Sequence, residues 1–321
     1  MSLEYIEIGA FRMEKIITIA QVIVPIFVAV FLGLLARRKK LLTPEQNQGL
    51  QQFVINFGLP CVIFNSCLTA DIGAESLSSM AMTLPFLIIA TLAAFSARKK
   101  LFPYHNFPQL FAAQETGMLG IPLFMILFGA NQAYRMGVMD LTQAVTAFPT
   151  IAILSARTND NLSPKTIVKS IVTSPLLIMS MLGLALNLSG IGDWLASIGV
   201  LGIITESTGF LGQPISAMMI FSVGYNFSLA KDSRSTIFKV SAIHFGYYAL
   251  AGVLIQLGLF LVPNVDALTR WAILMYTTLP ASYLAPSLGR TEDDYTIASG
   301  VCSVLTVVSL LIFCVIAAFV A

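Results

Sequence analysis

Charged residues are scarce in this chain, and their scarcity excludes an ordinary soluble domain. Asp, Glu, Lys and Arg make up 11% of the 321 residues, whereas hydrophobic residues make up 57%. Soluble domains carry about 25% charged residues. Together with a mean hydropathy of +0.84, this composition predicts an integral membrane protein that lies in the lipid bilayer. The net charge of +2 offers no basic surface for a nucleic acid, so we expect no nucleic-acid partner.

Histidine and cysteine are also few, and their spacing gives no sign of a metal centre. The two histidines, His105 and His244, have no other ligand type at metal-binding spacing, so we expect no metal and no cofactor. The sequence shows no nucleophile–base set and no phosphate-binding loop, which argues against an enzyme. The four cysteines fall within apolar runs and are expected to pack as small hydrophobic side chains: Cys61, Cys67, Cys302 and Cys314.

Long apolar runs are abundant, and their number predicts the topology. A helix needs about 20 apolar residues to cross a bilayer core. The stretch before Met13 is acidic and polar, unlike a cleavable signal, so residues 1–14 are expected to form an N-terminal extracellular tail. Ten spans are predicted: 15–36, 46–69, 78–97, 107–129, 134–156, 167–189, 207–229, 237–262, 268–289 and 293–320.

The basic residues predict the orientation of these spans. Of the 18 Lys and Arg residues, all but four lie in or next to every second loop, and these loops share one side of the membrane. An excess of Lys and Arg marks the cytoplasmic side, so both termini are expected to be extracytoplasmic. The exceptions on the other side are Arg12, Lys15, Arg135 and Arg270.

Weak self-similarity divides the chain into two repeats, at 15–158 and 159–321. Pro60 and Pro214 occupy similar places in the second and seventh spans, and Gly129 and Gly289 end the fourth and ninth. Because five spans is an odd number, the second repeat must enter the membrane with inverted topology. The predicted fold is therefore an all-α polytopic membrane protein with two inverted five-helix repeats.

Two of the predicted spans are interrupted at matching places in the two repeats. Gln114–Gly129 and Thr277–Gly289 both contain glycine and proline, which interrupt helical hydrogen bonding. We expect an extended piece at 117–121 followed by a half-helix from Pro122, and a break at 278–282. If the two segments cross, two half-helix N-termini would offer N–H groups and partial positive charge to a carboxylate. The alternative is that these residues only kink the helices.

Two acids lie at depth in the predicted spans. Glu115 lies about 12 Å into its span and Asp140 about 9 Å, at 1.5 Å per helical residue. An unpaired charge there costs at least about 2.5–3.5 kcal/mol, and no Lys or Arg lies deep enough to pair with either acid. Burial favours the protonated form of an acid, so both are candidates for proton coupling. Alternatively, Glu115 compensates the positive half-helix ends, and Asp140 hydrogen-bonds a neighbouring helix.

Polar residues beside these features complete the candidate site. Asn56 neighbours Pro60, Gln143 neighbours Asp140, and Thr278 lies in the second break. The predicted substrate-binding residues are Asn56, Thr116, Gly117, Gly120, Pro122, Gln143, Thr277, Thr278, Pro280 and Ser282.

Four stretches of the chain resemble the auxin efflux carrier family, within the wider superfamily of bile-acid, arsenite and riboflavin transporters. They are GLPCVIF in the second span, GMLGIPLFMILFG in the fourth, VMDLTQAV in the fifth and TLPASYLAPSLG in the ninth. The resemblance implies a scaffold and a transport subdomain, each drawn from both repeats, with broken helices 4 and 9 crossing at the site. It also implies elevator-type transport of an organic anion, such as malate, malonate or an auxin-like acid, by a homodimer.

The chain departs from the family pattern in two places. Many relatives carry Asn in the fourth-span break, where this chain has Glu115, Thr116 and Gly117. The long soluble insertion of plant members is absent, which points to a compact microbial form in a bacterial cytoplasmic membrane. A negative residue in the break suits an anion pocket only if it is protonated or offset by helix dipoles.

Three hypotheses for the function remain at this point. The first is a secondary active transporter of a small organic anion, coupled to protons through Glu115 or Asp140. The second keeps the fold but couples transport to Na⁺, held by backbone carbonyls and hydroxyls at the breaks. The third is a membrane sensor that binds a ligand without moving it, for which the short loops provide no signalling domain. A channel is disfavoured because rings of charged residues are missing.

Overall fold

The computed structural model describes residues 2–70, 74–98, 101–156, 169, 173–227, 233–262 and 265–320. Side chains are described from Ile17 onward. Every regular element in these ranges is a helix, which confirms the all-α prediction. The predicted boundary between the repeats, at 158/159, and the first residues of the span at 167–189 lie outside the described residues.

Within the described ranges, five helices are long and apolar enough to cross a membrane by themselves. They include Ile19–Arg38, Arg234–Leu259 and Glu292–Val320. A sixth span results if Pro175–Leu188 and Ile191–Ser197, bent by 75°, count as one. The chain is therefore a polytopic helical membrane protein. Several of the other predicted spans are interrupted, which leaves pieces too short to cross alone.

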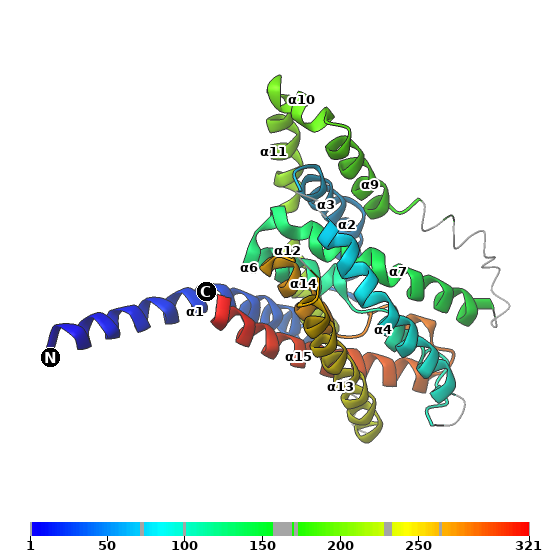
Figure 1. Cartoon of the computed structure of the whole chain (residues 1–321). Helices are drawn as coiled ribbons and strands as arrows, with labels where there is room; N and C mark the ends of the chain where they lie inside the picture. The colour runs from blue at the N-terminus through cyan, green and yellow to red at the C-terminus, as the bar shows by residue number, and fades with distance from the viewer. Residues whose placement is uncertain are drawn as a thin grey trace.

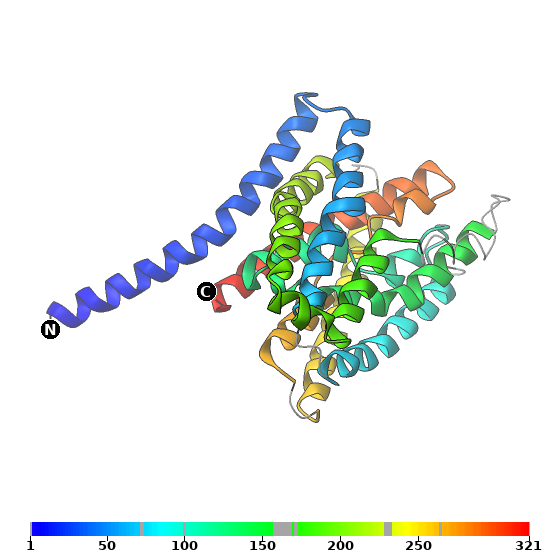
Figure 2. The same ribbon diagram turned by 90° about the horizontal axis from the view of Figure 1, so that it is seen from above.

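The first helix, α1 (Ser2–Arg38), is packed along its C-terminal half only. Its N-terminal half extends away from the other helices (Figures 1 and 2). Residues 2–14, predicted as a tail, are thus part of the same helix as the first span. The C-terminal half packs on α12 (Ile215–Asn226) through two glycines. A Cβ on Gly33 would lie 2.0 Å from the Phe221 carbonyl oxygen, and one on Gly224 would lie 2.1 Å from that of Val30.

The second predicted span consists of three consecutive helical pieces. Thr43 forms a capping box at the start of α2 (Pro44–Phe53), and the π-helix η1 (Val54–Gly58) leads into α3 (Leu59–Leu68). Pro60 lies in the first turn of α3, directly after the π-helix. Helix α3 packs on α9 (Pro175–Leu188).

Helices α9, α10 (Ile191–Ser197) and α11 (Val200–Gly212) form one arm of the molecule (Figure 1). Gly190 and Gly199 precede α10 and α11 with φ of 73° and 76°. This left-handed conformation is costly for residues with a side chain. The two glycines therefore allow the chain to turn sharply before α10 and again before α11.

The remaining helices surround the two interrupted segments. They are α4 (Ala74–Arg98), α7 (Ala133–Ala156), α13 (Arg234–Leu259), α14 (Ala267–Thr277) and α15 (Glu292–Val320). Helix α4 packs on α7, and α13 packs on α14 and α15. At one end of this group, Arg135 of α7 forms an ion pair with Asp266, 2.7 Å between Nη2 and Oδ2. Asp266 also caps α14 by accepting from the Thr269 N–H.

At the other end, a polar cluster joins the loop after α4 to α7 and α15. The buried carboxylate of Asp294 accepts from the His105 N–H (2.8 Å) and the Arg290 N–H (2.9 Å). The His105 ring lies 2.9 Å from Arg98 Nη2 through Nδ1 and 3.0 Å from the Leu154 carbonyl oxygen through Nε2. Arginine only donates and a carbonyl only accepts, so a neutral ring protonated on Nε2 satisfies both contacts.

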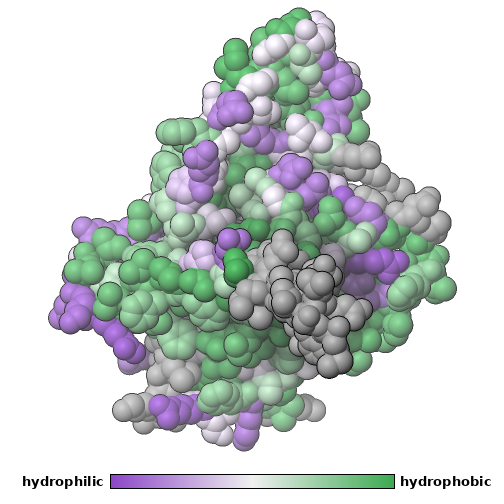
Figure 3. All heavy atoms as spheres, turned by 90° about the vertical axis from the view of Figure 1, so that its left-hand side faces the viewer, coloured by the Kyte–Doolittle hydropathy of each residue, from purple (hydrophilic) through white to green (hydrophobic). Residues whose placement is uncertain are grey.

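The outer surface of the helices is hydrophobic. On the face in Figure 3, hydrophobic side chains cover most of the surface and hydrophilic ones gather in separate patches. Phe31, Leu92, Ile203 and Leu311 are among the large apolar residues that are more than half exposed. In water such a surface would be unstable, whereas hydrocarbon accommodates it.

Candidate functional site

The first interrupted segment contains an extended piece between two helices. The short α5 (Gln109–Ala112) ends at Ala113, whose φ and ψ are −156° and 149°. A π-helix, η2 (Thr116–Gly120), then leads directly into α6 (Ile121–Phe128), with Pro122 in the first turn of α6. The break therefore lies at 113–115. The sequence-based position, 117–121, was wrong because those residues wind into the π-helix.

The second interrupted segment breaks where the sequence predicts. Helix α14 ends at Thr277, and the chain from Leu279 to Ala285 is irregular. Only one short 3₁₀ turn, η4 (Pro286–Leu288), follows. The prediction of a half-helix N-terminus at this break was wrong, because no α-helix restarts before Glu292. The N-terminal end of a half-helix thus comes from the first segment alone.

The two breaks lie against each other and exchange main-chain hydrogen bonds. Gln114 and Ala281 form an isolated antiparallel bridge. The Glu115 N–H donates to the Pro280 carbonyl (2.8 Å), and the Ser282 N–H donates to the Ala113 carbonyl (3.1 Å). Backbone groups freed by each break are therefore satisfied by the other, as burial in a membrane requires. We refer to residues 113–116 and 278–283 as the crossing.

The Glu115 carboxylate bridges the two sides of the crossing. Its Oε1 accepts from the Met118 N–H (3.1 Å) at the start of η2, and its Oε2 accepts from the Tyr283 N–H (2.7 Å) in the second segment. The side chain is 8% exposed. The N–H groups that the sequence assigns to a substrate carboxylate are thus occupied by a carboxylate of the chain itself.

Asp140 belongs to a second polar network beside the crossing. The Thr116 hydroxyl donates to Asp140 Oδ1, and Gln143 Nε2 donates to the same oxygen at 2.9 Å. Gln143 Oε1 accepts from the Gln114 N–H (2.7 Å) and from the Tyr276 hydroxyl (3.0 Å). One amide side chain therefore joins α7, the first break and α14. The structure brings Thr116, Asp140 and Gln143 together as neighbours.

The other predicted site residues divide into two groups. Gly120 lies against the second break, because a Cβ there would approach Leu279 Cδ1 to 2.7 Å. Asn56 is exposed in η1, and its amide donates to the Gln52 carbonyl rather than to a group at the crossing. Thr277, Thr278, Pro280 and Ser282 lie in or directly beside the second break. Gly117 lies in η2 and Pro122 in the first turn of α6, both C-terminal to the first break.

Two contributors were missed by the sequence-based prediction. Tyr283 supplies an N–H to Glu115, and its hydroxyl lies 2.6 Å from that of Thr306 on α15. Arg37, at the end of α1, donates through Nη1 to the Phe227 carbonyl (2.7 Å) and more distantly to that of Tyr225 (3.3 Å). Tyr283 could have been suspected from its place in the break, whereas nothing local in the sequence distinguishes Arg37 from its basic neighbours.

A cavity of about 380 Å³ adjoins the crossing on the Tyr283 side. Among the described residues that line it, Arg37 is the one that carries a charge. Hydroxyl and aromatic groups form much of the remaining wall, including Tyr225, Tyr283 and Thr306. The field in this cavity therefore favours an anion.

A second cavity, of about 250 Å³, lies beside Asp140 and Gln143, which hydrogen-bond Thr116 and Gln114 of the crossing. Asp140 and Gln143 line it on α7, Ile63 on α3 and Ser180 on α9. Asp140 is the one charged group among the lining residues that the structure describes. The two cavities flanking the crossing thus differ in the sign of their charge.

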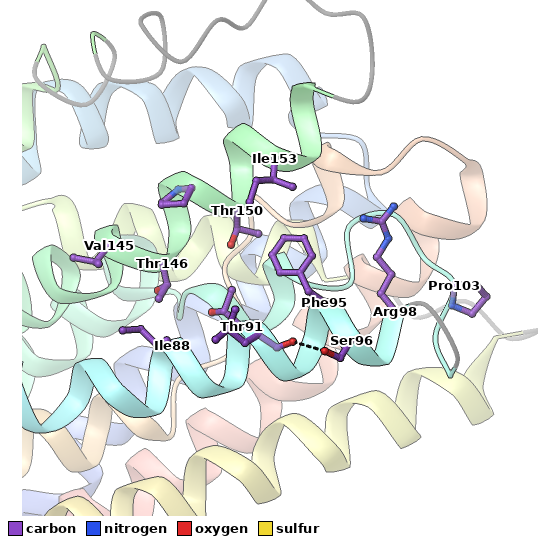
Figure 4. Close-up of a pocket in the computed structure, with 12 residues that line it drawn as sticks. Ile88, Thr91, Phe95, Ser96, Arg98, Pro103, Val145, Thr146, Thr150 and Ile153 are labelled. Carbon is purple, nitrogen blue, oxygen red and sulfur yellow. Dashed lines mark hydrogen bonds between the residues drawn. The ribbon is translucent and has the colours of Figure 1, made fainter.

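A third cavity, of about 930 Å³, opens between α4 and α7 at the outer surface (Figure 4). We call it the α4–α7 crevice. Ile88, Leu92 and Val145 form part of its apolar walls, and Arg98 stands at one end. It contains neither of the acids at the crossing.

Comparison with known proteins agrees with this architecture. The membrane transport protein family matches residues 18–321. An uncharacterized transporter of Methanothermobacter thermautotrophicus is 24% identical over 299 residues, which cover 90% of this chain and 94% of that protein. The match spans both interrupted segments and all five helices that could cross a membrane alone. The chain belongs to the membrane transport protein family.

Proposed function

We propose that the protein is a secondary active transporter of a small organic anion and couples its movement to protons. The candidate substrates are dicarboxylates such as malate or malonate and auxin-like acids. One observation carries the proposal: the Glu115 carboxylate is held at the crossing by N–H groups of both interrupted segments. A site that holds one carboxylate on main-chain donors has the geometry to hold another.

Protonation of Glu115 would provide the coupling. The neutral acid is a weaker hydrogen-bond acceptor than the carboxylate. The Met118 and Tyr283 N–H groups would then become available to a substrate carboxylate. With a monocarboxylate bound and Glu115 protonated, the crossing would carry the same net charge as the empty site with ionised Glu115, whereas a dicarboxylate would bring one further negative charge. Asp140 is the second group that would exchange protons. It accepts a hydrogen bond from the Thr116 hydroxyl and lines the cavity of about 250 Å³.

The cavity containing Arg37 is the proposed route of the anion to the crossing. Tyr283 lines this cavity and also donates its N–H to Glu115, so the cavity and the crossing share a wall. By the distribution of basic residues, the Arg37 end of α1 is cytoplasmic and both termini are extracytoplasmic. A bacterial cytoplasmic membrane is the proposed location.

Paired contacts support two inverted five-helix repeats with ten spans in all. The sequence Leu-Gly-Leu occurs around Gly33 in α1 and around Gly183 in α9. A Cβ on Gly33 would meet the Phe221 carbonyl oxygen at 2.0 Å, and one on Gly183 would meet that of Phe64 at 2.6 Å. Each phenylalanine follows an isoleucine in the partner helix. The contact between α1 and α12 is therefore matched by the contact between α9 and α3. The helix with the glycine comes first in the chain in one pair and second in the other.

A second pair of contacts relates the two interrupted segments. The Thr146 hydroxyl on α7 donates to the Ala112 carbonyl at the end of α5 (2.7 Å). The Ser309 hydroxyl on α15 donates to the Thr278 carbonyl at the end of α14. In both cases, a hydroxyl on the helix after the interrupted segment therefore caps the half-helix that ends at the break. In this proposal α1, α3, α9 and α12 form the scaffold, the crossing moves with the other helices as an elevator, and the transporter is a homodimer.

Transport of labelled acids into proteoliposomes tests the proposed function. We expect saturable uptake of at least one small carboxylate, accelerated by an imposed pH gradient and unchanged when choline replaces Na⁺. Dependence on Na⁺ rather than pH would favour the cation-coupled alternative. Binding without uptake would favour a sensor. If the folded protein neither binds nor takes up any of the acids, the proposal is refuted.

A further inference from the structure

The α4–α7 crevice lies where a membrane protein meets lipid. Its walls include Leu92 on α4 and Val145 and Ile153 on α7, which are 61%, 55% and 44% exposed. Helix α4 is one of the five helices able to cross a membrane alone. In the bilayer these side chains would contact acyl chains and not water.

The length of the crevice matches one leaflet of a bilayer. Its α4 wall runs from Ile88 to Arg98. Ten residues of helix rise about 15 Å at 1.5 Å each, which is half of a hydrocarbon core of about 30 Å. If Arg98 lies at the level of the headgroups, the crevice ends near the bilayer midplane. An acyl chain lying in it would place its headgroup beside the guanidinium.

The end of the crevice has the chemistry to bind a phosphate group. Arg98 and Pro103 stand there, beyond the apolar side chains (Figure 4). The contact between Arg98 Nη2 and His105 Nδ1 (2.9 Å) holds the guanidinium in position. The described residues that line the crevice include no acid. Arginine presents several N–H donors in one plane and commonly binds phosphate through two of them.

We propose that the α4–α7 crevice binds a phospholipid with an anionic headgroup. One acyl chain lies between α4 and α7, and the phosphate contacts Arg98. The lipid comes from the leaflet on the Arg98 side of the membrane. This site is independent of the proposed transport function, because neither Glu115 nor Asp140 lines it.

Native mass spectrometry of the purified full chain tests the proposal. The probes are phosphatidylglycerol and phosphatidylcholine with identical acyl chains, titrated separately into the detergent-solubilised protein. We expect the wild type to retain phosphatidylglycerol roughly fivefold better, the preference expected of one arginine near a lipid headgroup. Arg98→Gln should lose this preference. Arg38→Gln, which removes an exposed arginine at the end of α1, should keep it.

A second variant tests the crevice while Arg98 is retained, which separates lipid binding from a structural effect of removing this arginine. Val145→Trp places a bulky ring in the exposed apolar wall and leaves the arginine intact. It should lower retention of both lipids while its melting temperature stays near that of the wild type. Equal retention of the two lipids by the wild type, or an unchanged preference in Arg98→Gln, would overturn the proposal. Efficient cross-linking of Leu92→Cys between two copies would also overturn it, by showing a second chain in the crevice.

Discussion

The main-chain N–H of Tyr283 donates to the carboxylate of Glu115 at 2.7 Å, across 168 residues of sequence. The two residues belong to different interrupted segments, and the carboxylate also accepts from the Met118 N–H of its own segment. A change in the charge of Glu115 therefore acts on both segments at once.

Replacement of Glu115 by glutamine should remove proton coupling without unfolding the protein. The glutamine carbonyl can still accept one of the two N–H groups, so we expect a loss of about 1–3 kcal/mol in stability at most. Uptake of labelled anion should no longer respond to a pH gradient. Glu206→Gln, which removes an exposed acid on α11, is the matched control and should behave as wild type. A retained pH response in Glu115→Gln would assign coupling to another group.

Removal of the Thr116 hydroxyl should destabilise the Asp140 network. In Thr116→Val, Asp140 keeps the Gln143 donor and loses the hydroxyl that donates to the same oxygen. Loss of one hydrogen-bond donor to a buried charged group lowers the stability of a protein by about 1–3 kcal/mol. The double variant with Asp140→Asn should recover part of this loss, because the asparagine carries no charge. Thermal unfolding in detergent measures both effects, and additive losses would show that the two residues are not coupled.

Loss of the Arg37 charge should weaken anion binding more than turnover. Arg37→Gln leaves the cavity beside the crossing without a cation, so we expect KM to rise roughly tenfold, about 1.4 kcal/mol, with a smaller change in kcat. Arg37→Lys should recover most of the affinity. Arg38→Gln removes the neighbouring exposed charge and should have no effect. If Arg37→Gln only lowers the melting temperature, Arg37 serves to cap α12 and not to attract substrate.

A methyl group at Gly33 should force α1 and α12 apart. Its Cβ would lie 2.0 Å from the Phe221 carbonyl oxygen, which is rigid backbone and cannot move aside. Overpacking of this kind costs about 1–3 kcal/mol. Gly202→Ala on α11 is the control, because nothing lies within 4 Å of its Cβ position. We expect a lower melting temperature for Gly33→Ala and a small change for Gly202→Ala.

The stability of the protein should decrease as the pH falls below about 6.5, the ordinary pKa of histidine. Burial, followed by the charges of Arg290 and Arg98, lowers the pKa of His105 in the folded chain. The unfolded chain thus takes up a proton at a pH where the folded chain does not, which favours unfolding at acid pH and leaves stability unchanged above the ordinary pKa. Melting temperatures between pH 5 and 8 test this. His105→Gln should flatten the decrease, and an equally steep decrease in that variant would attribute it to other groups.

Much of the fold could be predicted because its signals are local. Pro280 lacks the N–H that a continuing helix uses and lies close to Pro286 and Gly289, so the break at 278–282 appeared where expected. The first break was displaced to 113–115, since long-range bonds from Glu115 to Pro280 and from Ser282 to Ala113 select which residues leave the helix. Asn56 was predicted from its nearness to Pro60, but the π-helix η1 and the packing of α3 decide which way its side chain points.

Composition alone determined that this chain lies in a membrane, because the cost of placing each side chain in hydrocarbon depends little on its neighbours. The local clustering of glycine and proline favoured interruption of two spans, whereas the single prolines Pro25, Pro85 and Pro149 lie inside continuous helices. Only the tertiary structure decided that Glu115 takes the N–H groups expected to serve a substrate. Those donors are main-chain groups that every residue but proline possesses, and only the approach of two distant segments places them around one carboxylate.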